Sequence, residues 1–224
     1  MATRKDGRTA EQLRAMICEL KPLNQADGSA RFQFGSTQVI SGVFGPREGR
    51  ASNRDSDEST ITVTWNRGAR MSGPREKEYE GIIRKTLEAL VVRAQDPLCV
   101  IDVTVQEMLE GGSSLAAGLN AAVVGLVEAG VALHSLCAAV AVALLPDGSA
   151  ALDPDSEEEA GAEAVVTVAV RASDNAILAC TCDGAVSEVR LLGAVQAATD
   201  ASKTIFTLVR MALEQRLETE QRCW

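Results

Sequence analysis

The most apolar part of the chain is the segment from Leu115 to Leu145, and it limits what the chain can fold into. Three polar residues interrupt it before it reaches the roughly 18–20 apolar residues that a bilayer requires: Asn120, Glu128 and His134. We therefore expect no membrane span. The segment predicts a buried helix over residues 115–129, closed by Gly130, and then a buried strand over residues 136–145.

Small side chains dominate this predicted helix, which allows a neighbouring backbone to approach closely: Ala116, Ala117, Gly118, Ala121, Ala122 and Gly125. Aromatic residues make up only 3% of the chain, so the core must consist of Ala, Val, Leu and Ile. Such a composition suits close packing of helices on a sheet. It also leaves few rings for stacking against the bases of a nucleic acid.

The remaining pattern alternates short strand-like segments with turns and helices. Strands are expected at 29–45 (two strands), 61–65, 99–109, 150–152, 164–171 and 177–182, helices at 76–93 and 193–220, and turns at 146–149 and 183–184. This mixed order favours an α+β fold of two layers, a mixed β-sheet packed with helices. We interpret residues 1–224 as a single domain.

Charge is distributed unevenly along the chain. The formal net charge is -9, which excludes a protein that is basic over its whole surface. Residues 1–93 nevertheless carry 16 basic and 12 acidic side chains, whereas residues 94–224 carry 6 and 19. A polyanionic ligand is therefore expected to meet the N-terminal half.

The six cysteines are scattered and contain no CxxC pair, and His134 is the only histidine. Cys180 and Cys182 share one face of a predicted strand, and His134 is expected in the core. These spacings predict no metal site and no cofactor. The first seven residues contain no apolar run, so we expect an intracellular protein with reduced thiols.

Arginines are concentrated in two polar segments: Arg47, Arg50, Arg54, Arg67, Arg70 and Arg75. One guanidinium group can donate two parallel hydrogen bonds to the oxygens of a phosphate. This favours a surface that contacts a phosphate backbone over a merely solvated loop.

Two other motifs have alternative interpretations. Gly111, Gly112, Ser113 and Ser114 precede a helix and could bind phosphate, but their spacing favours simple Ser capping of the helix. The acidic run could bind Mg²⁺, but a solvated loop is the favoured interpretation: Asp153, Asp155, Glu157, Glu158, Glu159 and Glu163.

Several short motifs follow one another along the chain: Asp6-Gly7-Arg8, Gln12-Leu13-Arg14, Ala26-Asp27-Gly28-Ser29-Ala30, Gly35-Ser36-Thr37-Gln38-Val39, Val43-Phe44-Gly45-Pro46, Arg75 to Leu87, Gly111-Gly112, Asn120-Ala121-Ala122, Leu126-Val127-Glu128-Ala129-Gly130 and Leu152-Asp153-Pro154. Their identity and order resemble the RNase PH family. The likeness spans nearly the whole chain. It is greatest to the short RNase PH-like subunits of the eukaryotic RNA exosome core.

The resemblance implies a subunit of a six-membered ring that threads single-stranded RNA. Active members use inorganic phosphate to shorten RNA from its 3′ end. Their Gly-Gly-Thr-Arg-Thr phosphate site corresponds here to Gly111-Gly112-Ser113-Ser114-Leu115, so Ser114 replaces the phosphate-holding arginine. Their two catalytic aspartates correspond to Glu159 and Val165, and a family arginine near the phosphate is retained as Arg75.

These replacements lead to the hypothesis of a non-catalytic ring subunit that supports 3′-to-5′ RNA processing and degradation and contacts RNA through Arg67, Arg70 and Arg75. Its expected partners are other RNase PH-like subunits and single-stranded RNA, with homo-oligomers possible when it is isolated. The expected location is the nucleus and nucleolus, and also the cytoplasm. The alternatives are a residual metal-dependent or phosphorolytic nuclease acting on RNA or DNA, and a purely structural spacer.

Overall fold

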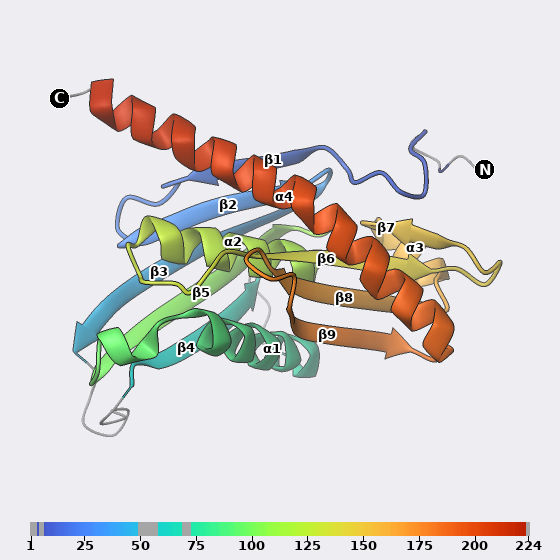
Figure 1. Ribbon diagram of the computed structural model, residues 1–224, viewed down its shortest axis with the longest axis horizontal. Coiled ribbons are helices and arrows are strands. Elements are labelled where there is room, and N and C mark those ends of the chain that lie inside the picture. Colours follow the sequence, from blue (N-terminus) through green and yellow to red (C-terminus); the bar gives the residue numbers. More distant parts are fainter. Residues whose placement is uncertain (1–3, 5–6, 49–57, 69–72, 223–224) are drawn as a thin grey trace.

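The computed structural model describes residue 4 and residues 7–48, 58–68 and 73–222, and it contains two β-sheets with helices between and around them (Figure 1). The first sheet has the strand order β1-β2-β3-β5-β4. Its strands are β1 (Met16–Leu20), β2 (Gly28–Phe34), β3 (Thr37–Glu48), β4 (Thr60–Arg67) and β5 (Cys99–Leu109). β4 and β5 run parallel and the other neighbours antiparallel, so this sheet is mixed.

The second sheet is antiparallel throughout and has the order β7-β6-β8-β9. Its strands are β6 (Cys137–Leu144), β7 (Ala150–Leu152), β8 (Ala164–Arg171) and β9 (Ile177–Gly184). The helices are α1 (Pro74–Leu90), α2 (Ser114–Glu128), α3 (Ser156–Gly161) and α4 (Glu188–Arg222), with a short 3₁₀ turn at Arg93–Gln95. The expected α+β class is confirmed.

Helix α2 packs against strands of both sheets and is buried from Leu115 through Leu126 (Figure 1). Two glycines let α2 lie this close to the first sheet: a Cβ added at Gly118 would lie 2.3 Å from the Trp65 ring, and one at Gly125 would lie 2.7 Å from Ser41 Oγ. Asn120, the polar residue within this helix, exchanges two hydrogen bonds with the backbone of Ala139 in β6. Strand β7 pairs only with residues 142–144 of β6 and does not extend to Ala139. The Asn120 amide therefore satisfies the backbone groups of Ala139 that a neighbouring strand would otherwise bond.

Several expectations about elements are wrong. β1 was not expected; it is a short strand containing Glu19 and exists by pairing with β2. α1 ends at Leu90 instead of residue 93, and α4 begins at Glu188 instead of residue 193. The pair Asp183-Gly184 belongs to strand β9 and does not form the expected turn. His134 is exposed because it lies in the loop after α2, not in the core.

The acidic run is not a solvated loop: most of it forms helix α3 and its N-cap. The described residues contain no group of three or more His, Cys, Asp or Glu side chains that could hold a metal ion. The Asp153 carboxylate is buried and pairs with Arg14 at 2.6 Å. Asp155 caps helix α3: its side chain accepts a bond from the backbone of Glu158, whose own side chain accepts one from the backbone of Asp155. Burial raises the pKa of the Glu158 carboxyl, but the hydrogen bond from Arg4, the bond from the Asp155 backbone and the charges of Arg4 and Arg8 together outweigh burial and lower it.

No helix in the described part of the chain combines the length and apolar character that crossing a bilayer requires. Helix α4 is long, but it lies across the second sheet and β1, and its own side chains Ile205 and Val209 are buried against them (Figure 1).

Candidate functional site

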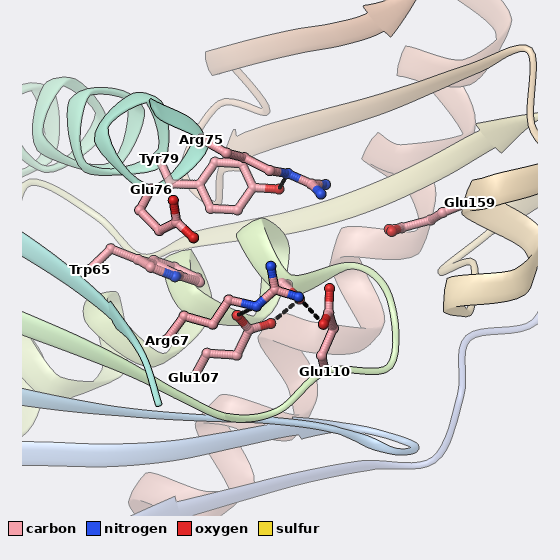
Figure 2. A pocket seen from close by; sticks show the side chains of 9 residues that line it. Trp65, Arg67, Arg75, Glu76, Tyr79, Glu107, Glu110 and Glu159 are labelled. Carbon is pink, nitrogen blue, oxygen red and sulfur yellow. Dashed lines mark hydrogen bonds and ion pairs between the residues drawn. The ribbon is translucent and has the colours of Figure 1, made fainter. Parts of the chain in front are cut away.

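A pocket of about 360 Å³ opens where the start of α1, the start of α2, α3 and the ends of β8 and β9 meet. Its lining brings together residues that are distant in the sequence: Arg75, Tyr79, Glu110, Ser113, Ser114, Leu115, Ser156, Glu159, Ala160, Ala162, Ala164, Val165, Thr167 and Asp183. A smaller hollow beside it is lined partly by the same residues and also by Trp65, Arg67 and Glu107 (Figure 2). Of the expected site residues, Ser113 and Ser114 of the phosphate site and Glu159 and Val165 of the acid site line this one pocket, whereas Gly111 and Gly112 are not part of its lining.

Arg75 lies in the first turn of α1, and its Nε donates a hydrogen bond of 2.9 Å to the Tyr79 hydroxyl (Figure 2). Its guanidinium carbon lies 5.5 Å from the centre of the Tyr79 ring. Burial lowers the pKa of Arg75, but its contacts with Tyr79 and the nearby charges of Glu159 and Asp183 outweigh burial and raise it. Arg75 is thus a permanent positive charge at the pocket.

Arg67 stands at the end of β4 and is held by two carboxylates. Arg67 Nε lies 3.4 Å from Glu107 Oε2, and Arg67 Nη2 pairs with Glu110 Oε2 (Figure 2). Much of its charge is therefore neutralised within the chain. Arg70, the third expected RNA contact, lies outside the described residues.

The Gly-Gly-Ser-Ser loop is fixed from beneath by the buried Arg14. This guanidinium donates to the carbonyl oxygen of Gly111 at 2.6 Å and to that of Gly112 at 3.2 Å, while it also pairs with Asp153. A left-handed backbone at Gly112 (φ 88°) and Ser113 (φ 57°) makes the sharp turn into α2. Arg14 thus holds the carbonyl groups of both glycines in place behind Ser113 and Ser114, which line the pocket.

Three donor groups of this loop are already used within the chain. The backbone N–H of Ser113 donates to Glu159 Oε1 at 2.6 Å, and its hydroxyl donates to the carbonyl of Pro154 at 3.0 Å. The Ser114 hydroxyl donates to the buried Glu107. Simple Ser capping of α2 is therefore wrong: Ser113 is at the N-cap position but makes no side-chain capping bond there. The loop also has fewer donors available for phosphate than its sequence suggested.

Glu159 and Val165 lie on α3 and β8, on one side of the pocket. Burial raises the pKa of Glu159, and the hydrogen bond from Ser113 and the charge of Arg75 only partly offset this. Val165 is half-buried and contributes only methyl groups to the same wall.

The polar residues of the pocket region that sequence reasoning missed include Tyr79, Glu107, Glu110 and Asp183. Asp183 was missed because Asp-Gly is a common turn signal. The alternation of Ala179, Thr181 and Asp183 could have extended the strand to this carboxylate. Glu107 could have been found from its position in β5, where the alternating pattern places a charged side chain in the buried series.

The pocket region as a whole contains more carboxylates than guanidinium groups. Glu76, Glu107, Glu110, Glu159 and Asp183 face only Arg67 and Arg75 among the described residues. Such a set binds hydrogen-bond donors and moves protons more readily than it binds a free phosphate ion.

Comparison with known proteins identifies two adjoining matches. Residues 12–132 match the family model described as "3' exoribonuclease family, domain 1", and residues 135–201 match "3' exoribonuclease family, domain 2". These models are named RNase_PH and RNase_PH_C, and together they cover most of the chain.

Among curated relatives, the "Exosome complex exonuclease RRP46 homolog" of Arabidopsis thaliana is 35% identical over 156 residues, which is 70% of this chain and 65% of that protein. The protein of the same name in Oryza sativa subsp. japonica is 35% identical over 157 residues, covering 70% of this chain and 66% of the relative. The aligned stretch therefore spans just under two thirds of these relatives. The "Exosome complex component Rrp41" of Thermococcus gammatolerans is 30% identical over 95% of this chain and 89% of its own length.

Two solved structures have a similar fold. The crystal structure of rice Rrp46 superposes with a TM-score of 0.90 at 30% identity, and the match covers 94% of this chain and all of the rice chain. A chain of an archaeal exosome core superposes with a TM-score of 0.77 at 19% identity, over 92% of this chain and 91% of the archaeal one, which shows the likeness in fold.

Proposed function

Because the chain belongs to the RNase PH family of 3′ exoribonucleases, we propose that it is a subunit of an exosome core ring and supports 3′-to-5′ RNA processing and degradation. Its expected ring partners are other RNase PH-like subunits. The likeness to rice Rrp46 over its full length supports this role, as do relatives whose names describe exosome components.

We further propose that the chain has lost phosphorolysis. The observation that carries this proposal is the state of the phosphate-site loop: Ser114 replaces an arginine, and the Ser113 N–H is bound by Glu159 within the chain. A phosphate ion would have to approach several carboxylates with Arg75 as its main cationic partner. Loss of one such charge-stabilising group typically slows an enzyme by about two to three powers of ten.

Assembly and activity can be tested in one preparation. The full chain is co-purified with candidate RNase PH-like subunits, and the mass of the complex is measured by light scattering; we expect a ring of six subunits. The chain alone and the complex are then given a 3′-tailed RNA with and without phosphate.

The chain alone should release no nucleoside diphosphates when phosphate is added. Phosphate-dependent release by the chain alone would contradict the loss of phosphorolysis. An activity that instead requires Mg²⁺ and disappears with EDTA would identify the alternative, a metal-dependent nuclease acting on RNA or DNA. Failure to enter any complex with RNase PH-like partners would contradict the role as a ring subunit. Light scattering of the isolated chain separately tests for homo-oligomers.

RNA contact is proposed for Arg75, with a smaller part for Arg67 because Glu107 and Glu110 already neutralise it. Substituting Arg75 by Glu in the complex should weaken RNA binding and reduce its salt dependence by about one ion. Arg210→Glu, an equal charge change on the exposed face of α4, is the control. Equal affinity and salt slope in the Arg75 variant and the control would favour a purely structural spacer.

A nuclear, nucleolar and cytoplasmic distribution is also proposed, in keeping with RNA processing. Imaging of the tagged full chain tests it, and confinement to a membrane-bound compartment outside the nucleus would contradict it.

A further inference from the structure

Two thiols stand on one face of the outermost strand of the second sheet. Cys180 and Cys182 are both exposed, and β9 is the last strand in the order β7-β6-β8-β9 (Figure 1). Their part of β9 pairs with β8 in an unbroken register, since the register shift of this ladder lies between Ala169 and Val170. Residues two apart in a regular strand project from the same face. The two thiols therefore lie together at an edge that no other described strand covers.

This face of β9 points away from the pocket. Asp183 of β9 lines the pocket together with Thr167 of β8, which pairs with Thr181. Because side chains alternate along a strand, Cys180 and Cys182 project from the opposite face. A ligand of the two thiols therefore lies outside the site described above.

The two sulfur atoms are close enough for the charge of one to affect the other. Burial raises the pKa of Cys180, and the neighbouring Cys182 raises it further because two adjacent thiolates repel each other. A cation held between the sulfur atoms removes this repulsion. Burial raises the pKa of Cys18 to about 11 and that of Cys137 to about 12, so these thiols are less suited to supply thiolates to a ligand.

The spacing of the exposed thiols favours a bridging ion over a disulfide. At a rise of about 3.3 Å per residue, the Cα atoms of Cys180 and Cys182 lie about 6.6 Å apart, and their Cβ atoms on the same face are separated by a similar distance. A disulfide usually requires Cβ atoms about 3.5–4.5 Å apart. Two thiolates joined through a metal ion span a longer distance than an S–S bond, so β9 can hold an ion without bending.

The number and kind of donor atoms select the ion. Thiolates are soft ligands that favour monovalent copper and zinc, whereas Mg²⁺ and Ca²⁺ prefer oxygen. Structural zinc sites almost always take four ligands, but the described residues contain no group of three or more His, Cys, Asp or Glu side chains that could hold a metal ion. Monovalent copper forms linear complexes with two thiolates. A pair of thiols is therefore sufficient for this ion.

We propose that Cys180 and Cys182 bind one monovalent copper ion between their sulfur atoms, on the face of β9 that points away from the pocket. Binding breaks two S–H bonds and forms two Cu–S bonds, and two protons pass to the solvent. Copper stays monovalent and no electron is transferred. The site adds an ion-binding property to the chain that does not depend on the proposed role in RNA processing.

Copper binding is measured on the reduced full chain without oxygen, with bicinchoninate, a coloured chelator of monovalent copper, as the competitor. We expect the chain to withdraw one copper ion from the chelator. X-ray absorption at the copper edge should then show two sulfur neighbours in a linear arrangement. Copper that stays with the chelator, or a coordination shell of nitrogen and oxygen atoms, would overturn the proposal.

Single variants locate the ion. Cys180→Ser and Cys182→Ser should each weaken copper binding by more than about 100-fold, because loss of a ligand costs more than loss of a residue that only orients a ligand. Cys99→Ser removes a thiol from the start of β5 and is the matched control, which should bind copper as the wild-type chain does. Equal copper affinity in the Cys180→Ser and Cys99→Ser proteins would contradict the site.

A rearranged pair tests the geometry. The double variant Thr181→Cys with Cys182→Thr keeps the composition of the chain but places its two thiols on opposite faces of β9. It should bind copper as weakly as the Cys180→Ser protein. Thermal unfolding of each copper-free protein checks the fold, and the single Ser variants, which alter only exposed side chains, decide the question if the double variant does not fold. Undiminished copper binding by a folded double variant would overturn the proposal.

Discussion

Glu159 connects parts of the pocket that are far apart in the sequence. It stands on α3, accepts a hydrogen bond from the Ser113 N–H before α2, and lies close enough to Arg75 on α1 to affect its pKa. Where the family motif has Asp, this chain has Glu159, and the side chain of Glu159 contacts the loop as well as lining the pocket. A longer side chain reaches the loop and occupies a donor that a ligand could otherwise use.

The raised pKa of Glu159 has a consequence for stability. Because the native state binds this proton more tightly than the unfolded chain, whose Glu pKa is about 4.3, the contribution of Glu159 becomes less favourable as pH rises from about 4 through the native pKa. Replacing Glu159 by Gln removes this dependence. Relative to the wild-type chain, the Glu159→Gln variant should therefore gain free energy of unfolding across that window and show a constant difference above it.

Urea unfolding at several pH values from about 4 to about 8 measures this effect. The control is Glu214→Gln, which removes one exposed carboxylate from α4 far from the pocket. If the stability of the Glu159→Gln variant relative to wild type fell with rising pH, the native environment would have to lower the pKa of Glu159.

At the scale of elements, the sequence predicted those whose signal is local. Helix α2 followed from an apolar segment rich in small residues, and it packs as closely as that pattern indicates. Helix α3 was missed because it buries no residue and has no apolar periodicity. Its signal was the Asp155–Glu158 capping box, which a run of carboxylates conceals.

Strand ends were hard to predict for a different reason. Asp183 continues β9 because it has Val165 opposite it in β8, a partner that is not visible from local sequence. Strand β1 likewise depends on a partner, because it is a strand through its pairing with β2. Long-range register thus decided between strand and turn at Asp183, where local alternation and the Asp-Gly turn signal disagreed, whereas the Gly-Gly-Ser-Ser loop, Arg75 and Glu159 were found from motifs.

The close packing of α2 can be tested with one methyl group. Gly118→Ala would place a Cβ 2.3 Å from the ring of Trp65, which is almost fully buried and cannot move away freely. We expect the free energy of unfolding to fall by about 1–3 kcal/mol, the usual effect of overpacking a core. The measurement is chemical denaturation of both proteins.

The matched control is Gly193→Ala in α4, where an added Cβ meets no other atom within 4 Å. Alanine favours a helix over glycine, so this variant should be unchanged or more stable by up to about 1 kcal/mol. If the two variants changed stability equally, helix propensity and not contact with Trp65 would govern the Gly118 position.

At the scale of the whole molecule, the two halves of the sequence meet at the pocket. The arginines come from the more basic N-terminal half, Arg67 from β4 and Arg75 from α1, while Glu110, Glu159 and Asp183 come from the acidic C-terminal half. The uneven charge along the chain therefore does not produce a separate positive face at this site. It produces a mixed pocket, and strong binding of an RNA backbone would need further cations from ring partners.

Helix α2 packs against strands of both sheets, which leads to a prediction that residues 1–224 unfold as one domain. Each sheet has its own probe. Trp65 is buried in the first sheet, and with Trp224 replaced by Phe it is the only tryptophan. Cys137 is buried in the second sheet, and burial raises the pKa of its thiol to about 12, so it should react with alkylating reagents only after unfolding.

In a urea series, Trp65 fluorescence and pulsed alkylation of Cys137, located by mass spectrometry, should give the same midpoint. The exposed Cys180 and Cys182 provide an internal control, because their labelling should not wait for global unfolding. Gly118→Ala should shift both midpoints together, since α2 transmits the loss of packing to each sheet. Separate midpoints, or a shift confined to the Trp65 signal, would mean that the two sheets unfold independently and that the chain contains two domains.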